Sequence, residues 1–196
     1  MANDVENRYE DAHDAEEEMA AEEAIEERNL TTLERLTEQF GKKVLDTSNR
    51  LGEATAVVDA KSLGKIMTWL RNEAGFILLS DVTAYDAHGS KPRFFVVYQL
   101  TNMDAPERLR IKVGLPEKKP TVESVVSIWA GANYMEREVY DLFGIRFKNH
   151  PNLKRILMPE EWEGHPLRKD YPDVYEEVQF THNAAEIAAR KPFARR

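Results

Sequence analysis

The stretch from Tyr134 to Pro172 gathers the residue types that could do chemistry. It holds seven acidic and seven basic residues and two His-Pro pairs within thirty-nine positions. Glu138 and Asp141 lie three residues apart, so on a helix both carboxylates would share a face, as general acid–base pairs sometimes do. A charged helix surface gives the same spacing, and the chain has no Gly-flanked nucleophilic serine, no cysteine and no glycine-rich phosphate loop. The pattern favours a charged helix surface over a catalytic site.

The same stretch contains residues that could hold a metal ion. His150 and His165 are fifteen residues apart, with Glu163 and Asp170 nearby, and two histidines with a carboxylate can hold zinc or iron. Each histidine directly precedes a proline, however, and neither belongs to an i,i+4 pair. We therefore expect the rings to pack and to donate to backbone carbonyls, with no metal site. A stand-alone metal-dependent hydrolase using His150, His165 and Glu138 is the alternative from another class.

Recognition of a partner protein fits the composition of this stretch better. Its prolines recur every six to eight residues, at Pro151, Pro159, Pro166 and Pro172. Such spacing excludes long helices and central strands, so an extended arm is expected. Aromatic residues and arginines anchor interfaces, and a backbone straightened by proline loses less entropy when it docks. We expect Arg155, Arg168 and Lys169 to pair with carboxylates of a neighbouring protein.

The elements that must position this stretch can be read from the preceding residues. Thr31 and Glu34 form a capping box for a helix with Leu33, Leu36 and Phe40 on one face. A second helix begins at Ser62 and stops before Gly75. Five runs have strand character, and they are 43–46, 55–59, 76–85, 93–100 and 108–113. Short loops join the last three, which predicts an antiparallel meander.

Two further helices are expected before the arm. One begins at Pro120 and carries Val122, Val125, Val126 and Trp129 on one face. The other begins at Asn133, with Glu136 completing a capping box, and ends at Gly144; Arg137 faces Asp141 in it at the i,i+4 spacing. The fold class is α+β, a mostly antiparallel sheet packed with helices and followed by an extended Pro-rich C-terminal arm. The predicted units are an acidic extension (1–29), an α+β domain (30–144) and the arm (145–196).

Composition limits the classes of function. Residues 1–28 contain twelve Asp/Glu against two Lys/Arg, a balance of -10, and the remainder sums to +2 out of a total of -8. A nucleic-acid-binding protein needs a clustered basic face, which this distribution does not indicate. No apolar run is long enough to span a bilayer and the first residues do not look like a secretory signal, so we expect the cytoplasm. Without cysteine the chain cannot form disulfides or cysteine-ligated iron–sulfur centres.

Two blocks of sequence resemble a known family. EREVYDLFGIRFKNHPNLKRIL, followed by GHPLRKDYP, closely resembles the signature of the 30-kilodalton subunit of respiratory NADH–quinone oxidoreductase (complex I). The two blocks also have the right mutual spacing. The Met158–Trp162 run departs from the Thr-Asp-Tyr-Gly-Phe run of mitochondrial members, so local contacts at that turn do not carry over.

The resemblance implies a cofactor-free subunit of the peripheral arm, on the cytoplasmic side of the plasma membrane. It implies packing against the quinone-site subunit (the 49-kilodalton homologue) and neighbouring iron–sulfur subunits, without a membrane span of its own. NADH, FMN, the iron–sulfur clusters and quinone would belong to the assembled complex. The expected interface comprises the signature positions. They are Glu136, Arg137, Glu138, Tyr140, Asp141, His150, Pro151, Arg155, Gly164, His165, Pro166, Arg168, Lys169, Asp170, Tyr171 and Pro172.

This chain would brace the machinery, with no catalytic residue, cofactor ligand or metal ligand of its own. A related membrane-bound hydrogenase, or a quinone reductase with a donor other than NADH, is the alternative within the same superfamily. The unfused chain and its complete double His-Pro signature favour the NADH-dependent complex.

Overall fold

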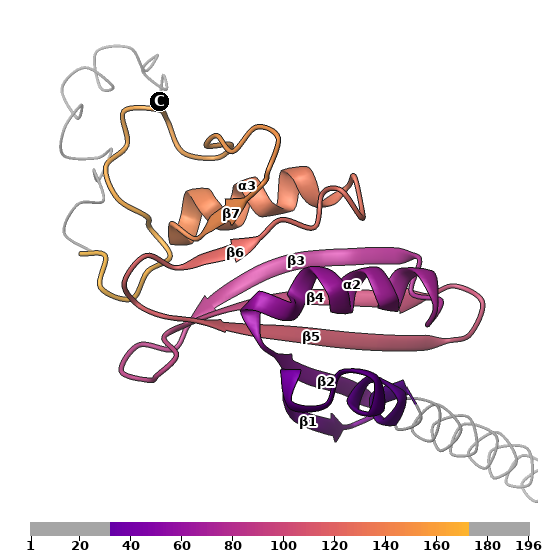
Figure 1. Ribbon diagram of the computed structural model, residues 1–196. Coiled ribbons are helices and arrows are strands. Elements are labelled where there is room, and N and C mark those ends of the chain that lie inside the picture. The colour runs from indigo at the N-terminus through magenta and orange to yellow at the C-terminus, as the bar shows by residue number, and fades with distance from the viewer. Residues whose placement is uncertain (1–31, 173–196) are drawn as a thin grey trace, which may run out of the picture.

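The computed structural model describes residues 32–172, which form a five-stranded sheet with helices packed against it (Figure 1). The strands lie in the order β1-β2-β5-β4-β3. Their bounds are Val44–Arg50 (β1), Glu53–Val58 (β2), Leu78–Asp86 (β3), Phe94–Asn102 (β4) and Glu107–Leu115 (β5). The acidic extension, Thr31 of the predicted capping box and the last part of the predicted arm lie outside the described residues.

The sheet is mixed, and its antiparallel pairings predominate. β3 pairs with β4 and β4 with β5, both antiparallel, which confirms the predicted meander. β1 and β2 form an antiparallel hairpin, while β2 joins β5 in parallel, with Ala54 opposite Leu109. The predicted α+β class with a mostly antiparallel sheet is confirmed.

The helices bury their apolar faces on the sheet, as their periodicity predicts. Residues 32–40 are helical and bury Leu33 and Leu36; helix α2, Leu63–Asn72, buries Ile66 and Leu70 completely. The ring of Trp69 on α2 lies edge-on to Phe40, with 5.7 Å between centroids. Short 3-10 turns precede β1, at Gly41–Lys43, and α2, at Ala60–Ser62. Figure 1 shows α2 lying along the part of the sheet made by β3, β4 and β5.

The helix predicted from Pro120 is wrong. Thr121–Glu123 is strand β6, and it pairs in parallel with β7, Arg146–Lys148, opposing Val122 to Phe147. Only a single helical turn follows, where the Trp129 amide donates to the carbonyl of Val125. The apolar spacing that suggested a helix arises from a strand and a turn that both face the core. The β-branched residues of this run are the local signal that favours a strand.

Helix α3, Ala132–Phe143, lies on the β3 side of the sheet, with β6 and β7 beside it (Figure 1). The backbone amide of Val82, on the edge strand β3, lies 3.2 Å from the Met135 sulfur, so α3 covers this edge. Gly131 occupies the N-cap without a side-chain hydrogen bond, so the predicted capping box of Asn133 and Glu136 is wrong. Gly144 ends the helix in the left-handed conformation, with φ of 73°, as predicted.

No helix within residues 32–172 combines the length and apolar character that crossing a membrane requires.

Candidate docking surface

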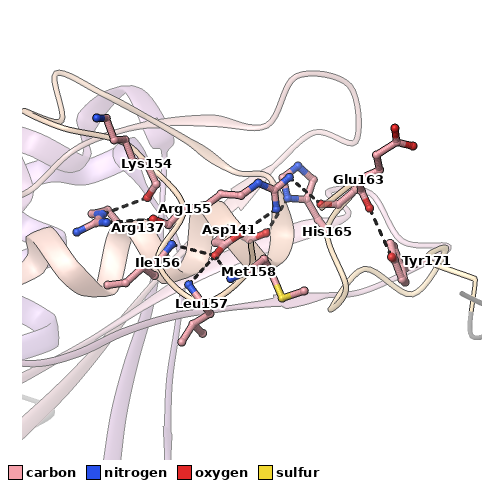
Figure 2. A network of polar contacts seen from close by, with 11 residues as sticks. Arg137, Asp141, Lys154, Arg155, Ile156, Leu157, Met158, Glu163, His165 and Tyr171 are labelled. Atoms are coloured by element: carbon pink, nitrogen blue, oxygen red, sulfur yellow. Dashed lines mark hydrogen bonds and ion pairs between the residues drawn. The ribbon is translucent and has the colours of Figure 1, made fainter. Parts of the chain in front are cut away.

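The carboxylate of Asp141 holds the start of the segment that follows β7. One oxygen accepts backbone hydrogen bonds from Ile156, Leu157 and Met158, at 3.0, 2.8 and 2.9 Å. The other accepts from the Arg155 guanidinium at 2.8 Å. Figure 2 shows these donors converging on a carboxylate that is 0% exposed. One side chain near the end of α3 therefore fixes the backbone of three successive residues.

The donors keep Asp141 ionised. Burial alone would raise the pKa of the carboxyl, but the three backbone N–H groups and Arg155 together hold the pKa below its usual value. Arg137 is not the partner of Asp141, contrary to the i,i+4 expectation. Its guanidinium donates instead to the backbone carbonyls of Lys154 and Arg155, at 3.1 and 3.0 Å. Both side chains of the predicted pair thus hold the same later segment.

A second contact joins the segment to the end of α3 at Gly144. His165 Nδ1 donates to the carbonyl of Asp141 at 2.7 Å, and Arg168 Nε donates to that of Phe143 at 2.6 Å. A Cβ on Gly144 would lie 2.5 Å from the His165 ring and 2.6 Å from the Arg168 guanidinium. Glycine is therefore required here for space as well as for φ. Burial lowers the pKa of His165, and the nearby guanidinium groups act in the same direction.

The other signature histidine also bonds to backbone. His150 Nε2 donates to the carbonyl of Asn133 at 3.1 Å, and Nδ1 accepts from the amide of Asn152 at 3.0 Å, which fixes a neutral tautomer. Within residues 32–172 no group of three His, Asp or Glu side chains is arranged to hold a metal ion. His150, His165 and Glu138, the ligand set of the hydrolase alternative, are not brought together.

Arg93 fastens the far end of the segment to the sheet. It forms a bidentate pair with the buried Asp86, at 2.9 and 2.7 Å, and an ion pair with Asp170 at 2.9 Å. The amide of Lys169 also donates to Asp86, at 2.9 Å, and Glu117 accepts from Arg93 at 2.7 Å. The Arg93 guanidinium lowers the pKa of Asp86 and of Asp170, while the carboxylates raise that of Arg93. Asp170 is thus paired within the chain.

The ring of Phe94 lies between two guanidinium groups. Arg93 is 4.9 Å and Arg168 is 5.1 Å from its centroid, within the range of cation–π attraction. Sequence reasoning missed this cluster. Asp86 and Arg93 flank the turn between two predicted strands, and that placement is the signal by which the pair could have been found.

Glu136 has an internal role different from that of Asp141. Its two oxygens accept from the Ser124 hydroxyl at 2.6 Å and from the Val125 amide at 2.7 Å, which joins α3 to the end of β6. It is 0% exposed and no cation lies within ion-pair distance among the described residues. Burial therefore raises the pKa of Glu136 to about 7. The fully buried Tyr98 hydroxyl nearby has no hydrogen-bond partner among residues 32–172.

The remaining signature residues shape the segment. Gly164, with φ of +86°, brings the Tyr171 ring close, and the Tyr171 hydroxyl donates to the carbonyl of Glu163 at 3.4 Å (Figure 2). The Tyr140 ring lies edge-on to His165. Four further signature residues are partly or fully exposed, namely Glu138, Pro151, Pro166 and Pro172. Glu138 and Asp141 do not share a face, because only the first reaches solvent.

Residues 145–172 therefore pack against the domain instead of extending away from it. The predicted boundary at residue 144 falls between two elements that belong together, because β7 pairs with β6. Arg155 and Arg168, expected to bind a neighbour's carboxylates, donate within the chain. What the segment presents to solvent is apolar: Ile156, Leu157 and Leu167 are 39%, 59% and 48% exposed. The predicted partner contacts of the signature residues stay a prediction.

Comparison with known proteins gives a consistent result. Residues 56–177 match the family described as the 30 Kd subunit of respiratory-chain NADH dehydrogenase. The chain is 44% identical over 169 residues to an NADH-quinone oxidoreductase subunit of Roseiflexus sp. (strain RS-1), covering 85% of this chain and 97% of the relative. It is 46% identical over 139 residues to the subunit of the same name from Geobacter metallireducens, covering 70% and 86%.

Solved structures show a similar fold. The trypsin-resistant fragment of Nqo5 is 33% identical, with a TM-score of 0.56, and the match covers 62% of this chain and 98% of the fragment. A chain of the archaeal membrane-bound sulfane sulfur reductase is 21% identical, with a TM-score of 0.62 and coverage of 86% and 97%, which shows a shared fold alone.

Proposed function

The chain belongs to the family of the 30-kilodalton subunit of respiratory-chain NADH dehydrogenase, and on that premise we propose that it braces the peripheral arm of an NADH–quinone oxidoreductase. The bracing surface is the segment 149–172, held rigidly on the end of α3. Its neighbours are the quinone-site subunit, the 49-kilodalton homologue, and the adjacent iron–sulfur subunits, on the cytoplasmic side of the membrane. NADH, FMN, the clusters and quinone are bound by those other subunits.

One observation carries this proposal. The charged signature residues bond to backbone and to one another within the chain, so they shape a surface and leave it apolar. Three leucine and isoleucine side chains point outward from a backbone fixed by Asp141 and by the Leu167 amide bond to the carbonyl of Leu142, at 3.1 Å. An exposed apolar patch on a rigid support is typical of a protein interface. Pre-ordering of this kind lowers the entropy lost on docking.

The contacts of the charged residues also support a role without chemistry in this chain. Both signature histidines hydrogen-bond to backbone carbonyls, and Asp141 and Asp170 are bound to arginines. Glu136, whose raised pKa would suit a general acid, has 0% exposure and thus no access to a substrate. Among the described signature residues none combines a free reactive group with access from solvent in a cleft.

The test uses the full-length chain in a strain that lacks the native subunit. A Leu157→Asp variant places a charge on the proposed surface, and Leu51→Asp places the same charge on a leucine that is 92% exposed at the distant β1–β2 turn. We expect Leu157→Asp to reduce the amount of assembled complex on native gels and NADH–quinone activity in membranes, and Leu51→Asp to leave both unchanged. Equal assembly with the two variants would contradict the docking role.

A further inference from the structure

The exposed apolar side chains of the segment form one small surface around the end of α3. Leu157 is held through its amide on Asp141, and Leu167 through its amide on Leu142, the next residue of the helix. Ile156 is held by the same Asp141 oxygen as Leu157. Because their anchors are adjacent, these three side chains lie on a common patch. Its centre is apolar, which leaves the rim to decide which partner fits.

The positive charges near this patch are already used. Arg137 bonds to the carbonyls of Lys154 and Arg155, Arg155 to Asp141 and the carbonyl of Gly164, and Arg168 to the carbonyl of Phe143; these are the contacts of Figure 2 and of the Gly144 junction. A guanidinium in such a geometry cannot be given to a neighbour without breaking the segment. The arginines therefore hold the patch and do not form its rim.

The negative charges of the rim are free by contrast. Glu160, Glu161 and Glu163 are exposed, and none has a cation within ion-pair distance among residues 32–172. They follow Leu157 directly, on the turn 158–163. Three like charges within four residues repel one another, and a cationic surface would relieve that repulsion. Lys154, the nearby exposed cation, precedes the patch.

We infer that the patch docks on a partner surface that has an apolar hollow for Ile156, Leu157 and Leu167 and a lysine- or arginine-rich rim facing Glu160, Glu161 and Glu163. This inference rests on the proposed function and adds the sign of the partner's charge. It reverses the expectation from sequence, in which the arginines of this segment meet a neighbour's carboxylates. Rim charges mainly set the association rate and reject wrong partners, while the apolar centre supplies affinity.

The experiment compares three full-length variants in the strain that lacks the native subunit. The first carries Glu160→Lys, Glu161→Lys and Glu163→Lys. Its matched control carries Glu34→Lys, Glu38→Lys and Glu73→Lys, the same change of charge on exposed residues of the helix 32–40 and the end of α2. The third is Leu157→Asp. All six glutamates are exposed and unpaired within the described residues, so thermal melts of the purified chains should match the unsubstituted protein.

We expect the rim variant to lower the yield of assembled complex about tenfold or more, and the control to leave it unchanged, because reversal places like charges across the interface. Raising the salt during reconstitution should weaken assembly with the native rim and improve it with the reversed rim.

The other outcomes separate the two proposals. If Leu157→Asp blocks assembly while the rim variant assembles as well as its control, or better, the basic partner is wrong and the docking role survives. If the control fails as badly as the rim variant, net charge alone matters and the inference is wrong. Normal assembly with Leu157→Asp as well would overturn the docking role itself.

Discussion

The two ends of α3 each bury one carboxylate, and the two carboxylates behave in opposite ways. Glu136, near the start, faces the Ser124–Val125 turn after β6; Asp141, near the end, faces residues 155–158. Both are 0% exposed, so burial acts on both. Asp141 has three backbone donors and a guanidinium, which lower its pKa, whereas Glu136 has two neutral donors, and its pKa is raised to about 7.

Donors, more than depth, therefore decide whether a buried acid of this helix is charged. The contrast also separates two jobs. A charged Asp141 fixes an irregular segment that has no hydrogen-bond ladder of its own. A largely uncharged Glu136 joins elements already held by the sheet and its apolar core. The two regions should respond differently to substitution and to pH.

The largest effect is expected from Asp141→Asn, which keeps the shape and removes the charge. Arg155 then loses its partner and part of the backbone cage is unsatisfied, at a cost of about 3–5 kcal/mol. Because the sheet does not depend on these contacts, the loss should appear as local opening. Hydrogen exchange at the amides of Ile156, Leu157 and Met158 measures it directly. Unchanged protection at these amides would show that Asp141 is not the anchor.

The elements around this anchor were largely predictable, and the anchor itself was not. Periodicity found α2, α3 and the strands β3 to β5, because each is amphipathic over its own length. The Arg137–Asp141 pair was expected from helical spacing, but Asp141 is buried and its donors come from residues 155–158. Local spacing cannot report a partner that only the tertiary fold supplies.

The error at β6 has the same cause. Val122, Val125, Val126 and Trp129 recur at helical intervals, yet the strand is decided by its pairing with β7, more than twenty residues later. The capping box failed because burial of Glu136 moved its carboxylate from the helix start to the preceding turn. Glycine was the reliable signal, since the left-handed end of α3 at Gly144 is a local requirement.

The second effect, on pH dependence, tests the other carboxylate. The pKa of Glu136 is about 7 in the folded chain against an ordinary 4.5, so the folded state keeps a proton that the unfolded state releases between these values. The contribution to stability is fully present below pH 4.5 and is lost as the pH rises through 7, by about 3 kcal/mol. Urea denaturation at several pH values measures it.

The control for this prediction is Glu136→Gln, which cannot titrate. The difference in unfolding free energy between the native chain and the variant should change across pH 5–7. His165 has a lowered pKa and acts with the opposite sign, and the lowered carboxylates act at lower pH, but both contributions cancel in that difference. A difference that stays constant with pH would mean that Glu136 is ionised throughout.

The third effect is expected from Gly144→Ala, at the junction between the two regions. Alanine at φ of 73° costs about 1–2 kcal/mol from the backbone, and its Cβ also displaces His165 and Arg168. Hydrogen exchange should rise at the Leu167 amide, which bonds to Leu142, and stay unchanged at the amides of β4. Gly52→Ala, with the same φ of 73° and open space around it, isolates the backbone cost.

The smallest effect is expected from Glu138, the third carboxylate of α3 and the only exposed one. It has no ion pair among the described residues, so Glu138→Gln should change the unfolding free energy by less than about 0.5 kcal/mol. Denaturation in low and high salt checks this value. A loss near that of Asp141→Asn would show that net charge on the helix, and not the cage around Asp141, holds the segment. The contrast between buried and exposed acids on one helix would then fail as an explanation.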